Sequence, residues 1–173
     1  MPWKAYSSAS ARHMTKNIGI VTLAIQGWLR GSIDLVERNA SGVLRVTDYK
    51  TGKARTKPGV VVGGGEVLQP VLYALVCETL LAAPVEGGRL YYCTSDGGFV
   101  DRRVELEPSR AAAAEVVSIV AGALHEGFLP AAPRAQACRW CDYRPVCGPW
   151  EEQRTRGKPP DRVRDLRRLR ELP

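Results

Sequence analysis

The segment from Gly31 to Gly52 carries two carboxylates and one ammonium whose types and spacing could do chemistry. Asp48 and Lys50 are two residues apart, so in a β-strand they share one face of the sheet. If the turn of a hairpin is centred near Ser41, Asp34 on the preceding strand lies opposite Asp48. Two such carboxylates can hold a divalent cation, and a neighbouring lysine can stabilise charge that develops on a phosphate. The pattern therefore indicates metal-dependent hydrolysis of phosphodiesters.

Residue types on both sides of a polar run support this hairpin. The run from Arg38 to Gly42 has the composition of a loop, and strand-forming residues flank it. These flanking residues are Ile33, Leu35, Val43 and Val46. A register slip of one residue would move Asp34 to the other face of the sheet. For an isolated D-x-K pattern, a surface hairpin with solvated charges is the alternative interpretation.

A helix is expected directly after the hairpin, in the segment from Glu66 to Leu81. Proline is tolerated only in the first helical turn, so Pro70 places the helix start near Glu66 or Val67. Gln69 and Tyr73 are then one turn apart and lie on one stripe. An ordinary amphipathic helix would explain the same spacing. Cys77 continues the stripe and is interpreted as a small buried side chain.

The remaining elements predict one mixed α/β domain, because strands and helices alternate along the chain. One strand before the hairpin would extend it into a three-strand meander whose second strand begins the hairpin, and a second strand pair and a second helix follow the first helix. Their expected ranges are Ile18 to Ile25, Trp28 to Val36, Arg89 to Cys93, Phe99 to Val104 and Pro108 to Gly127. The glycine-rich connection from Val60 to Gly65 is interpreted as a flexible linker, with a phosphate cradle of backbone amides as the alternative.

Three cysteines near the C-terminal end form the second group that could do chemistry. Cys138, Cys141 and Cys147 have the spacing C-x2-C-x5-C, and thiolates bind zinc or iron–sulfur clusters. Cys93 falls in an expected strand, where a place in the core is the favoured interpretation. The odd count of 5 cysteines and the lack of a secretory signal argue against a disulfide framework.

Three short motifs together resemble the signature of PD-(D/E)XK nucleases of the RecB type. They are GSID at 31–34, TDYKTGK at 47–53 and LQPVLY at 68–73. The chain is also similar to AddB-type helicase subunits and to CRISPR-associated exonucleases with iron–sulfur clusters. The resemblance covers about Leu29 to Trp150. It implies an α/β restriction-endonuclease-like core, with a mixed β-sheet flanked by helices. It also implies a Mg²⁺- or Mn²⁺-dependent deoxyribonuclease in DNA repair or recombination, with a helicase as partner protein.

The resemblance also assigns roles to five residues. Asp34 and Asp48 would hold the metal, and Lys50 would complete the catalytic site. Gln69 and Tyr73 would lie on the next helix and support the site or the DNA strand. Related proteins often carry a further histidine or glutamate on an upstream helix.

For the cysteines, the resemblance implies a [4Fe–4S] cluster held by Cys138, Cys141 and Cys147 with a fourth cysteine from upstream of the nuclease motifs. No cysteine precedes Cys77 in this chain. Three interpretations stay open, namely a truncated form, a three-cysteine site and a zinc site completed by another ligand. Upstream of Asp34, His13 is the only residue that could add a metal ligand. If upstream helices are missing, the alternative function is a nuclease-fold module that binds DNA or protein without activity.

Length and charge agree with a cytoplasmic, DNA-binding domain. The chain has 173 residues and a formal net charge of +7, and no run approaches the ~20 apolar residues of a membrane span. A positive charge favours a polyanionic partner, and Lys53, Arg55 and Lys57 follow the proposed catalytic strand where a DNA backbone would pass.

Three regions are expected along the chain. Residues 1–17 are interpreted as a poorly ordered segment or truncated start, residues 18–150 as the nuclease-like domain with its cysteines, and residues 151–173 as a basic tail. In the tail, apolar residues recur at every third position, which predicts a short helix after Pro160. These residues are Val163, Leu166, Leu169 and Leu172. Such a helix could pack on the domain, dock a partner or track DNA.

Overall fold

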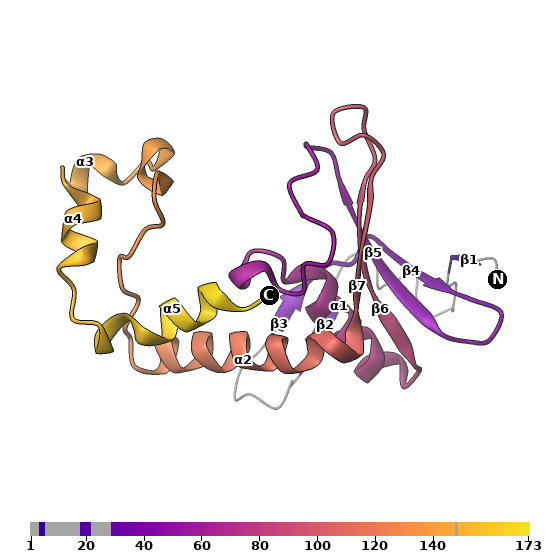
Figure 1. Cartoon of the computed structure of the whole chain (residues 1–173). Helices are drawn as coiled ribbons and strands as arrows, with labels where there is room; N and C mark the ends of the chain where they lie inside the picture. Colours follow the sequence, from indigo (N-terminus) through magenta and orange to yellow (C-terminus); the bar gives the residue numbers. More distant parts are fainter. Residues whose placement is uncertain (1–3, 6–17, 22–28, 148) are drawn as a thin grey trace.

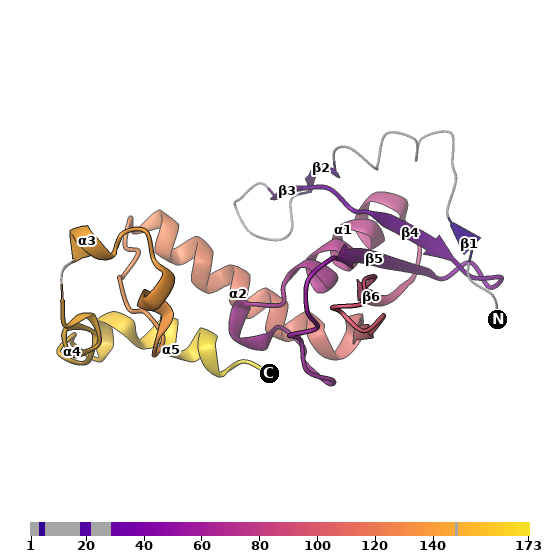
Figure 2. The ribbon, with the colours of Figure 1, turned by 90° about the horizontal axis from the view of Figure 1, so that it is seen from above.

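The computed structural model describes residues 4–5, 18–21, 29–147 and 149–173 (Figure 1). The main β-sheet lies at one end of the molecule, helices α1 and α2 lie against it, and several short helices lie at the other end (Figure 2). Among the helices in these ranges, none is long and apolar enough to cross a membrane. The expected segment 1–17, including His13, lies outside the described residues except for Lys4 and Ala5.

Five strands form the main sheet in the order β1-β4-β5-β6-β7. Their bounds are Lys4–Ala5 for β1, Leu35–Arg38 for β4, Leu44–Lys50 for β5, Val85–Tyr92 for β6 and Asp101–Glu105 for β7. Strands β5 and β6 are parallel, whereas the other neighbouring pairs are antiparallel. A parallel pair needs a crossover connection, which helix α1 supplies between β5 and β6. The mixed sheet with its helices confirms the predicted α/β class.

The turn between β4 and β5 is organised by one asparagine. Asn39 Oδ1 accepts hydrogen bonds from the backbone N–H groups of Ser41 and Val43, both at 3.0 Å. It also accepts the Ser41 hydroxyl at 2.8 Å. Gly42 has a φ of +87°, which a residue without Cβ adopts at little cost. These contacts fix the length of the turn and therefore the register of the two strands.

The predicted three-strand meander is wrong. Strands β2 (Ile18–Val21) and β3 (Leu29–Gly31) pair with each other in a separate two-stranded sheet. The expected strand from Trp28 to Val36 is interrupted at residues 32–34, where the Asp34 carboxylate bonds to β5. The segment before the interruption therefore joins β2, and the segment after it joins β5.

Helices α1 (Gln69–Leu81) and α2 (Leu106–His125) pack against the main sheet, and α2 also packs against α1. Helix α1 has Pro70 in its first turn as expected. It begins later than the predicted Glu66 or Val67, because Gly63–Gly65 form a separate 3-10 turn, η2. The two later strands and helix α2 each begin or end within a few residues of their expected bounds, which is normal for element ends.

The core lies between α1, α2 and one face of the sheet. Val46 from β5, Ala74 from α1 and Leu106 from α2 are almost fully buried there. Helix α1 approaches the sheet so closely that a Cβ on Gly88 would lie 2.2 Å from the carbonyl oxygen of Pro70. Cys77 is buried as predicted, and burial raises the pKa of its thiol to about 12 because the charged thiolate is poorly solvated there.

The opposite face of the sheet carries a compact network of charges. Glu37 Oε2 accepts hydrogen bonds from Arg45 Nε at 3.1 Å, Thr47 Oγ1 at 2.9 Å and Arg89 Nη2 at 3.0 Å. The Arg45 and Glu37 side chains are only 5% and 12% exposed. One carboxylate on β4 therefore compensates two largely buried guanidinium groups, one on β5 and one on β6.

Short helices fill the C-terminal part of the chain. Their bounds are Ala137–Trp140 for η3, Arg144–Cys147 for α3, Glu151–Arg156 for α4, Asp161–Val163 for η4 and Arg164–Glu171 for α5. Val163 is buried, and Leu169 and Leu172 pack against the core, so the tail follows the first of its three expected behaviours and packs on the domain.

The tail is attached to the glycine turn η2. The N–H groups of Val62 and Gly63 donate to the Pro173 carbonyl oxygen at 2.6 and 2.9 Å, and the Gly64 N–H donates to Leu172 O at 3.0 Å. The predicted linker is thus a docking turn, and its amides are bonded to protein rather than to a phosphate. Gly63, Gly64 and Gly65 all have positive φ, and a Cβ on Gly64 would lie 2.8 Å from Arg170 O.

Candidate active site

Asp34 directly precedes β4 and faces Asp48 on β5. The two strands pair Leu35 with Thr47, so continuing this register by one residue sets Asp34 opposite Asp48. The register predicted from the hairpin is confirmed. Asp34 Oδ2 accepts a hydrogen bond from the backbone N–H of Tyr49 at 2.8 Å, which holds this carboxylate against the end of β5.

Asp48 and Lys50 project from the same face of β5, as alternation along a strand predicts. Lys50 Nζ lies 2.7 Å from Asp48 Oδ2, and the two side chains are 33% and 8% exposed. Asp48 Oδ2 is buried and has no hydrogen-bond partner among the described residues, so its contact with Lys50 is an ion pair without hydrogen-bond geometry. A buried carboxylate oxygen of this kind is left with unused capacity to bind a cation.

Gln69 and Tyr73 extend the site onto helix α1. Lys50 Nζ donates a hydrogen bond to Gln69 Oε1 at 2.5 Å, and Gln69 Nε2 donates to the Tyr73 hydroxyl at 3.3 Å. The structure therefore brings the five residues predicted from the sequence together around the C-terminal end of the central strand β5. The chain of contacts from Asp48 to Tyr73 fixes the position of the Lys50 ammonium.

Gly31 is a site residue that the sequence reasoning did not single out. A Cβ at this position would lie 3.2 Å from Tyr73 Cε1, closer than most Cβ contacts in proteins. The glycine lets the tyrosine ring lie against β3. The signal in the sequence was the glycine that opens the GSID motif.

The donor set suits a hard divalent cation. Mg²⁺ commonly binds one or two carboxylates and completes its coordination with water and phosphate oxygens. Asp34 and Asp48 supply two carboxylates, and Asp48 Oδ2 has no hydrogen-bond donor within the part of the chain that is described. No group of three or more His, Cys, Asp and Glu side chains that could hold a metal is found among the described residues. The residues therefore fit a cation that is largely coordinated by water and substrate.

The cysteine segment lies at the opposite end of the molecule from the main sheet (Figures 1 and 2). Burial and the neighbouring Glu151 carboxylate raise the pKa of the Cys138 thiol, and Cys141 and Cys147 contribute in the same direction. Even so, the described residues include no metal-binding group at these three cysteines. Cys93 is part of the sheet region, where its thiol donates to Lys50 O at 3.6 Å.

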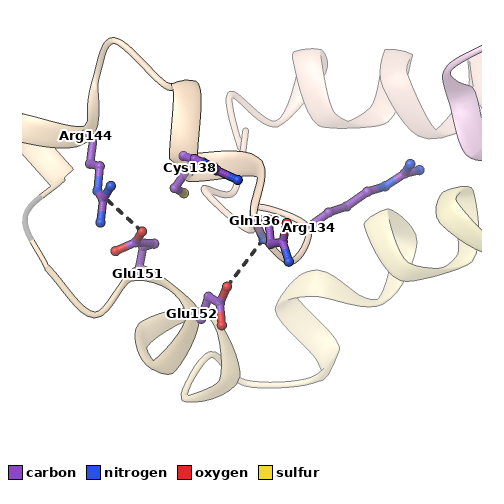
Figure 3. Close-up of a pocket in the computed structure, with 7 residues that line it drawn as sticks. Arg134, Gln136, Cys138, Arg144, Glu151 and Glu152 are labelled. Atoms are coloured by element: carbon purple, nitrogen blue, oxygen red, sulfur yellow. Dashed lines mark hydrogen bonds and ion pairs between the residues drawn. The ribbon is translucent and has the colours of Figure 1, made fainter.

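A polar cavity of about 300 Å³ lies beside the cysteine segment (Figure 3). Its lining residues are Arg134, Gln136, Cys138, Arg139, Arg144, Glu151 and Glu152. Ion pairing of Arg144 with Glu151 at 3.8 Å and a hydrogen bond from Gln136 N to Glu152 Oε1 at 3.4 Å use much of its polar surface. None of the five predicted catalytic residues lines this cavity, so it is separate from the candidate active site.

Arg134 connects the cysteine segment to the turn before helix α1. Its side chain points away from the cavity (Figure 3), pairs with Glu66 and donates to Gly64 O at 3.3 Å. Arg170 on the tail donates to Ala132 O. The C-terminal segments therefore converge on the turn that leads into the helix with Gln69 and Tyr73.

Comparison with known proteins gives one match. Residues 3–148 match the sequence model of the PD-(D/E)XK nuclease superfamily. The match spans both carboxylates, the lysine of β5, the helix that follows and the three C-terminal cysteines. Searches of curated proteins and of solved structures returned no match.

Proposed function

Because this chain belongs to the PD-(D/E)XK nuclease superfamily, we propose that it is a metal-dependent deoxyribonuclease that hydrolyses phosphodiester bonds at Asp34, Asp48 and Lys50. The observation that carries the proposal is the buried Asp48 oxygen, which lies 2.7 Å from the Lys50 ammonium and has no hydrogen-bond donor among the described residues. The Lys50 ammonium offsets the charge of this oxygen, and the lone pairs that accept no hydrogen bond are available to a divalent cation.

Each residue of the site has a distinct task in this proposal. Asp34 and Asp48 would hold Mg²⁺ or Mn²⁺, which when bound polarises the phosphate and lowers the pKa of a bound water. Lys50 places a positive charge where the scissile phosphate gains negative charge. Gln69 accepts a hydrogen bond from Lys50 and receives support from Tyr73, so these two residues orient the ammonium.

The direct test is cleavage of labelled single- and double-stranded DNA with Mg²⁺, with Mn²⁺ and with a chelator. We expect cleavage only with the metals, and a loss of at least about 100-fold in kcat for Lys50→Ala and Asp48→Ala. Lys158→Ala is a suitable control, because it also removes one lysine but lies between α4 and η4, outside the site.

The same assay addresses the second candidate, a nuclease-fold module that binds DNA or protein without cutting it. Its supporting observation is the small donor set, since no third acidic or histidine ligand joins Asp34 and Asp48 among the described residues. A wild-type protein that binds DNA but cleaves no better than Lys50→Ala would favour this module over the nuclease.

The RecB-type assignment and a role in DNA repair or recombination are part of the proposal. Their support is the three motifs GSID, TDYKTGK and LQPVLY in one chain. A helicase partner follows from the same resemblance. Co-purification from the native host under low salt, with the recovered partner tested for DNA-stimulated ATP hydrolysis, would check this part separately from cleavage.

An iron–sulfur cluster on Cys138, Cys141 and Cys147 is a separate proposal, with zinc as the alternative. The close spacing of the thiols supports it, whereas the described arrangement does not gather them into one site. Anaerobic purification followed by metal analysis decides the matter. Iron with inorganic sulfide and a brown colour supports the cluster, zinc in a colourless protein supports the alternative, and neither metal rejects both.

A further inference from the structure

The loop after β5 and the turn between β6 and β7 are bonded into one unit beside the candidate active site. The Cys93 N–H donates to Lys50 O at 3.0 Å, and Thr94 Oγ1 donates to Thr51 O at 2.9 Å. Gly97 packs so closely that a Cβ there would lie 2.9 Å from Gly52 O. In Figure 1 the two segments rise together at the top of the view. Strand β5 therefore continues directly into a loop that two hydrogen bonds hold against the turn between β6 and β7.

A second set of bonds holds the far end of the same loop. The hydroxyls of Thr56 and Tyr92 lie 2.9 Å apart, and Arg102 Nε donates to Thr56 O at 2.9 Å. Thr56 is held against the sheet, whereas Arg55 and Lys57 on either side of it are exposed. The loop is therefore preorganised, which lowers the entropy cost of any contact it makes.

Three cations project from this loop into solvent. Lys53, Arg55 and Lys57 are exposed, and none of them takes part in an ion pair with another described residue. Most other arginines of the β-sheet, by contrast, are paired with carboxylates. A row of unpaired cations that begins a few residues after Lys50 offers contacts to successive phosphates.

Phe99 stands in the turn that supports these cations. Its side chain is 62% exposed, and its φ of +52° lies in the left-handed region that bulky residues rarely adopt. Its N–H donates to Thr94 O at 3.3 Å, so the strained conformation is part of the turn. An exposed aromatic ring alone is common on protein surfaces. Here the turn that holds the ring is also bonded to the loop that carries the three cations, and its strained backbone is of the kind that concentrates at functional sites.

We propose that loop 51–57 and Phe99 form a contact site for single-stranded DNA, in which the cations bind phosphates and the phenyl ring stacks on an unpaired base. The inference rests on the proposed nuclease function and specifies its substrate class. Bases inside a duplex are already stacked on their neighbours, whereas a single strand presents them to an aromatic side chain. The site would hold the DNA strand beyond the C-terminal end of β5, where loop 51–57 follows Lys50.

Binding can be measured without catalysis, by fluorescence anisotropy of labelled oligothymidylate and of a blunt duplex in a chelating buffer. Phe99→Ala should weaken oligothymidylate binding about tenfold, as expected for the loss of one stacked base, and leave duplex binding within about twofold. Phe99→Tyr keeps a ring and should restore binding. Leu129→Ala is the matched control, because Leu129 is an exposed apolar residue, at 73%, in the segment after α2.

The cations have a different expected effect. Lys53→Ala and Lys57→Ala should each lower the slope of log affinity against log salt by about 0.7 on the single strand, and they should weaken duplex binding as well. Equal affinity of Phe99→Ala and wild type for oligothymidylate would overturn the inference, as would equal losses on both DNAs. The binding assay contains no metal, so it is independent of cleavage. A protein that binds as expected here but cleaves no DNA in the assay with Mg²⁺ or Mn²⁺ would reject the nuclease function and keep this contact site. A protein that cleaves DNA but binds oligothymidylate equally well with Phe99→Ala would keep the nuclease function and reject the contact site.

Discussion

The carboxylate of Asp34 accepts a hydrogen bond from the backbone N–H of Tyr49 at 2.8 Å, although the two residues are 15 positions apart. This bond connects the carboxylate of one strand end to the residue between Asp48 and Lys50. Asp34 would therefore have two roles. Its carboxylate holds the end of β5 through this bond, and it would also offer an oxygen to a cation.

Paired substitutions should separate these tasks. Asp34→Asn keeps an oxygen that can accept the Tyr49 N–H but removes the charge, whereas Asp34→Ala removes both. We expect both variants to lose DNA cleavage, and only Asp34→Ala to lose stability, by about 1 kcal/mol for one hydrogen bond. Cleavage assays and urea unfolding measure the two effects. Full activity of Asp34→Asn would show that its charge is not needed for metal binding.

Gln69 is expected to act as a positioning residue through Lys50. Gln69→Ala should lower kcat by about 10- to 100-fold, as for other residues that orient a catalytic group, with little change in KM. It should also change the pH profile of kcat, because the Lys50 ammonium loses its acceptor at 2.5 Å. Gln69→Glu retains an acceptor and should restore part of the activity. An unchanged pH profile in Gln69→Ala would contradict the positioning role.

The docking turn allows a matched test of the tail. Gly64 and Gly127 have nearly the same φ, +63° and +62°, but a Cβ would collide with Arg170 O only at Gly64. Gly127→Ala should cost about 1–2 kcal/mol for the left-handed backbone alone. Gly64→Ala should cost about 1–3 kcal/mol more through overpacking, and it should also lower kcat because α1 shifts. Equal urea midpoints for the two variants would mean that the tail docks weakly.

The charge network on the face of the sheet opposite the core should contribute to stability. Glu37→Ala leaves Arg45 and Arg89 without their shared carboxylate, so we expect a loss of about 3–5 kcal/mol. Glu86→Ala is the control, because Glu86 is 44% exposed and lies 3.9 Å from Arg45, and it should cost about 1 kcal/mol or less. Similar unfolding midpoints for the two variants would indicate that other groups compensate the arginines.

Alkaline pH should destabilise the protein through Cys77. Burial raises the pKa of this thiol from 9.0 to about 12. Between these values the unfolded chain releases the proton and the folded chain keeps it, so ionisation favours unfolding as pH rises. Stability should therefore fall by up to about 1.4 kcal/mol per pH unit above pH 9. Cys77→Ala should flatten this part of the profile in urea unfolding, and an identical slope would exclude the thiol as its source.

The sequence was sufficient for the features that depend on local pattern. The turn near Ser41 placed Asp34 opposite Asp48, alternation placed Lys50 beside Asp48, and Pro70 located the first turn of α1. Each follows from a short-range rule of backbone geometry.

Features that depend on contacts between distant segments could not be predicted. The role of Gly64 required knowing that the tail returns to it, and the separation of β2 and β3 from the main sheet required knowing that these two strands pair only with each other among the described residues. The common metal site at Cys138, Cys141 and Cys147 stays a prediction, because spacing alone does not fix how short helical turns orient their side chains.

The bonds between the glycine turn and residues 172 and 173 have a consequence for the order of folding. The loop they close contains α1, strands β6 and β7, α2 and the cysteine segment, so closing it costs chain entropy that only late contacts can repay. During synthesis, strand β5 and its two charged side chains leave the ribosome long before the tail does. The charged half of the site can therefore form early, whereas the helix start that carries Gln69 reaches its final support last.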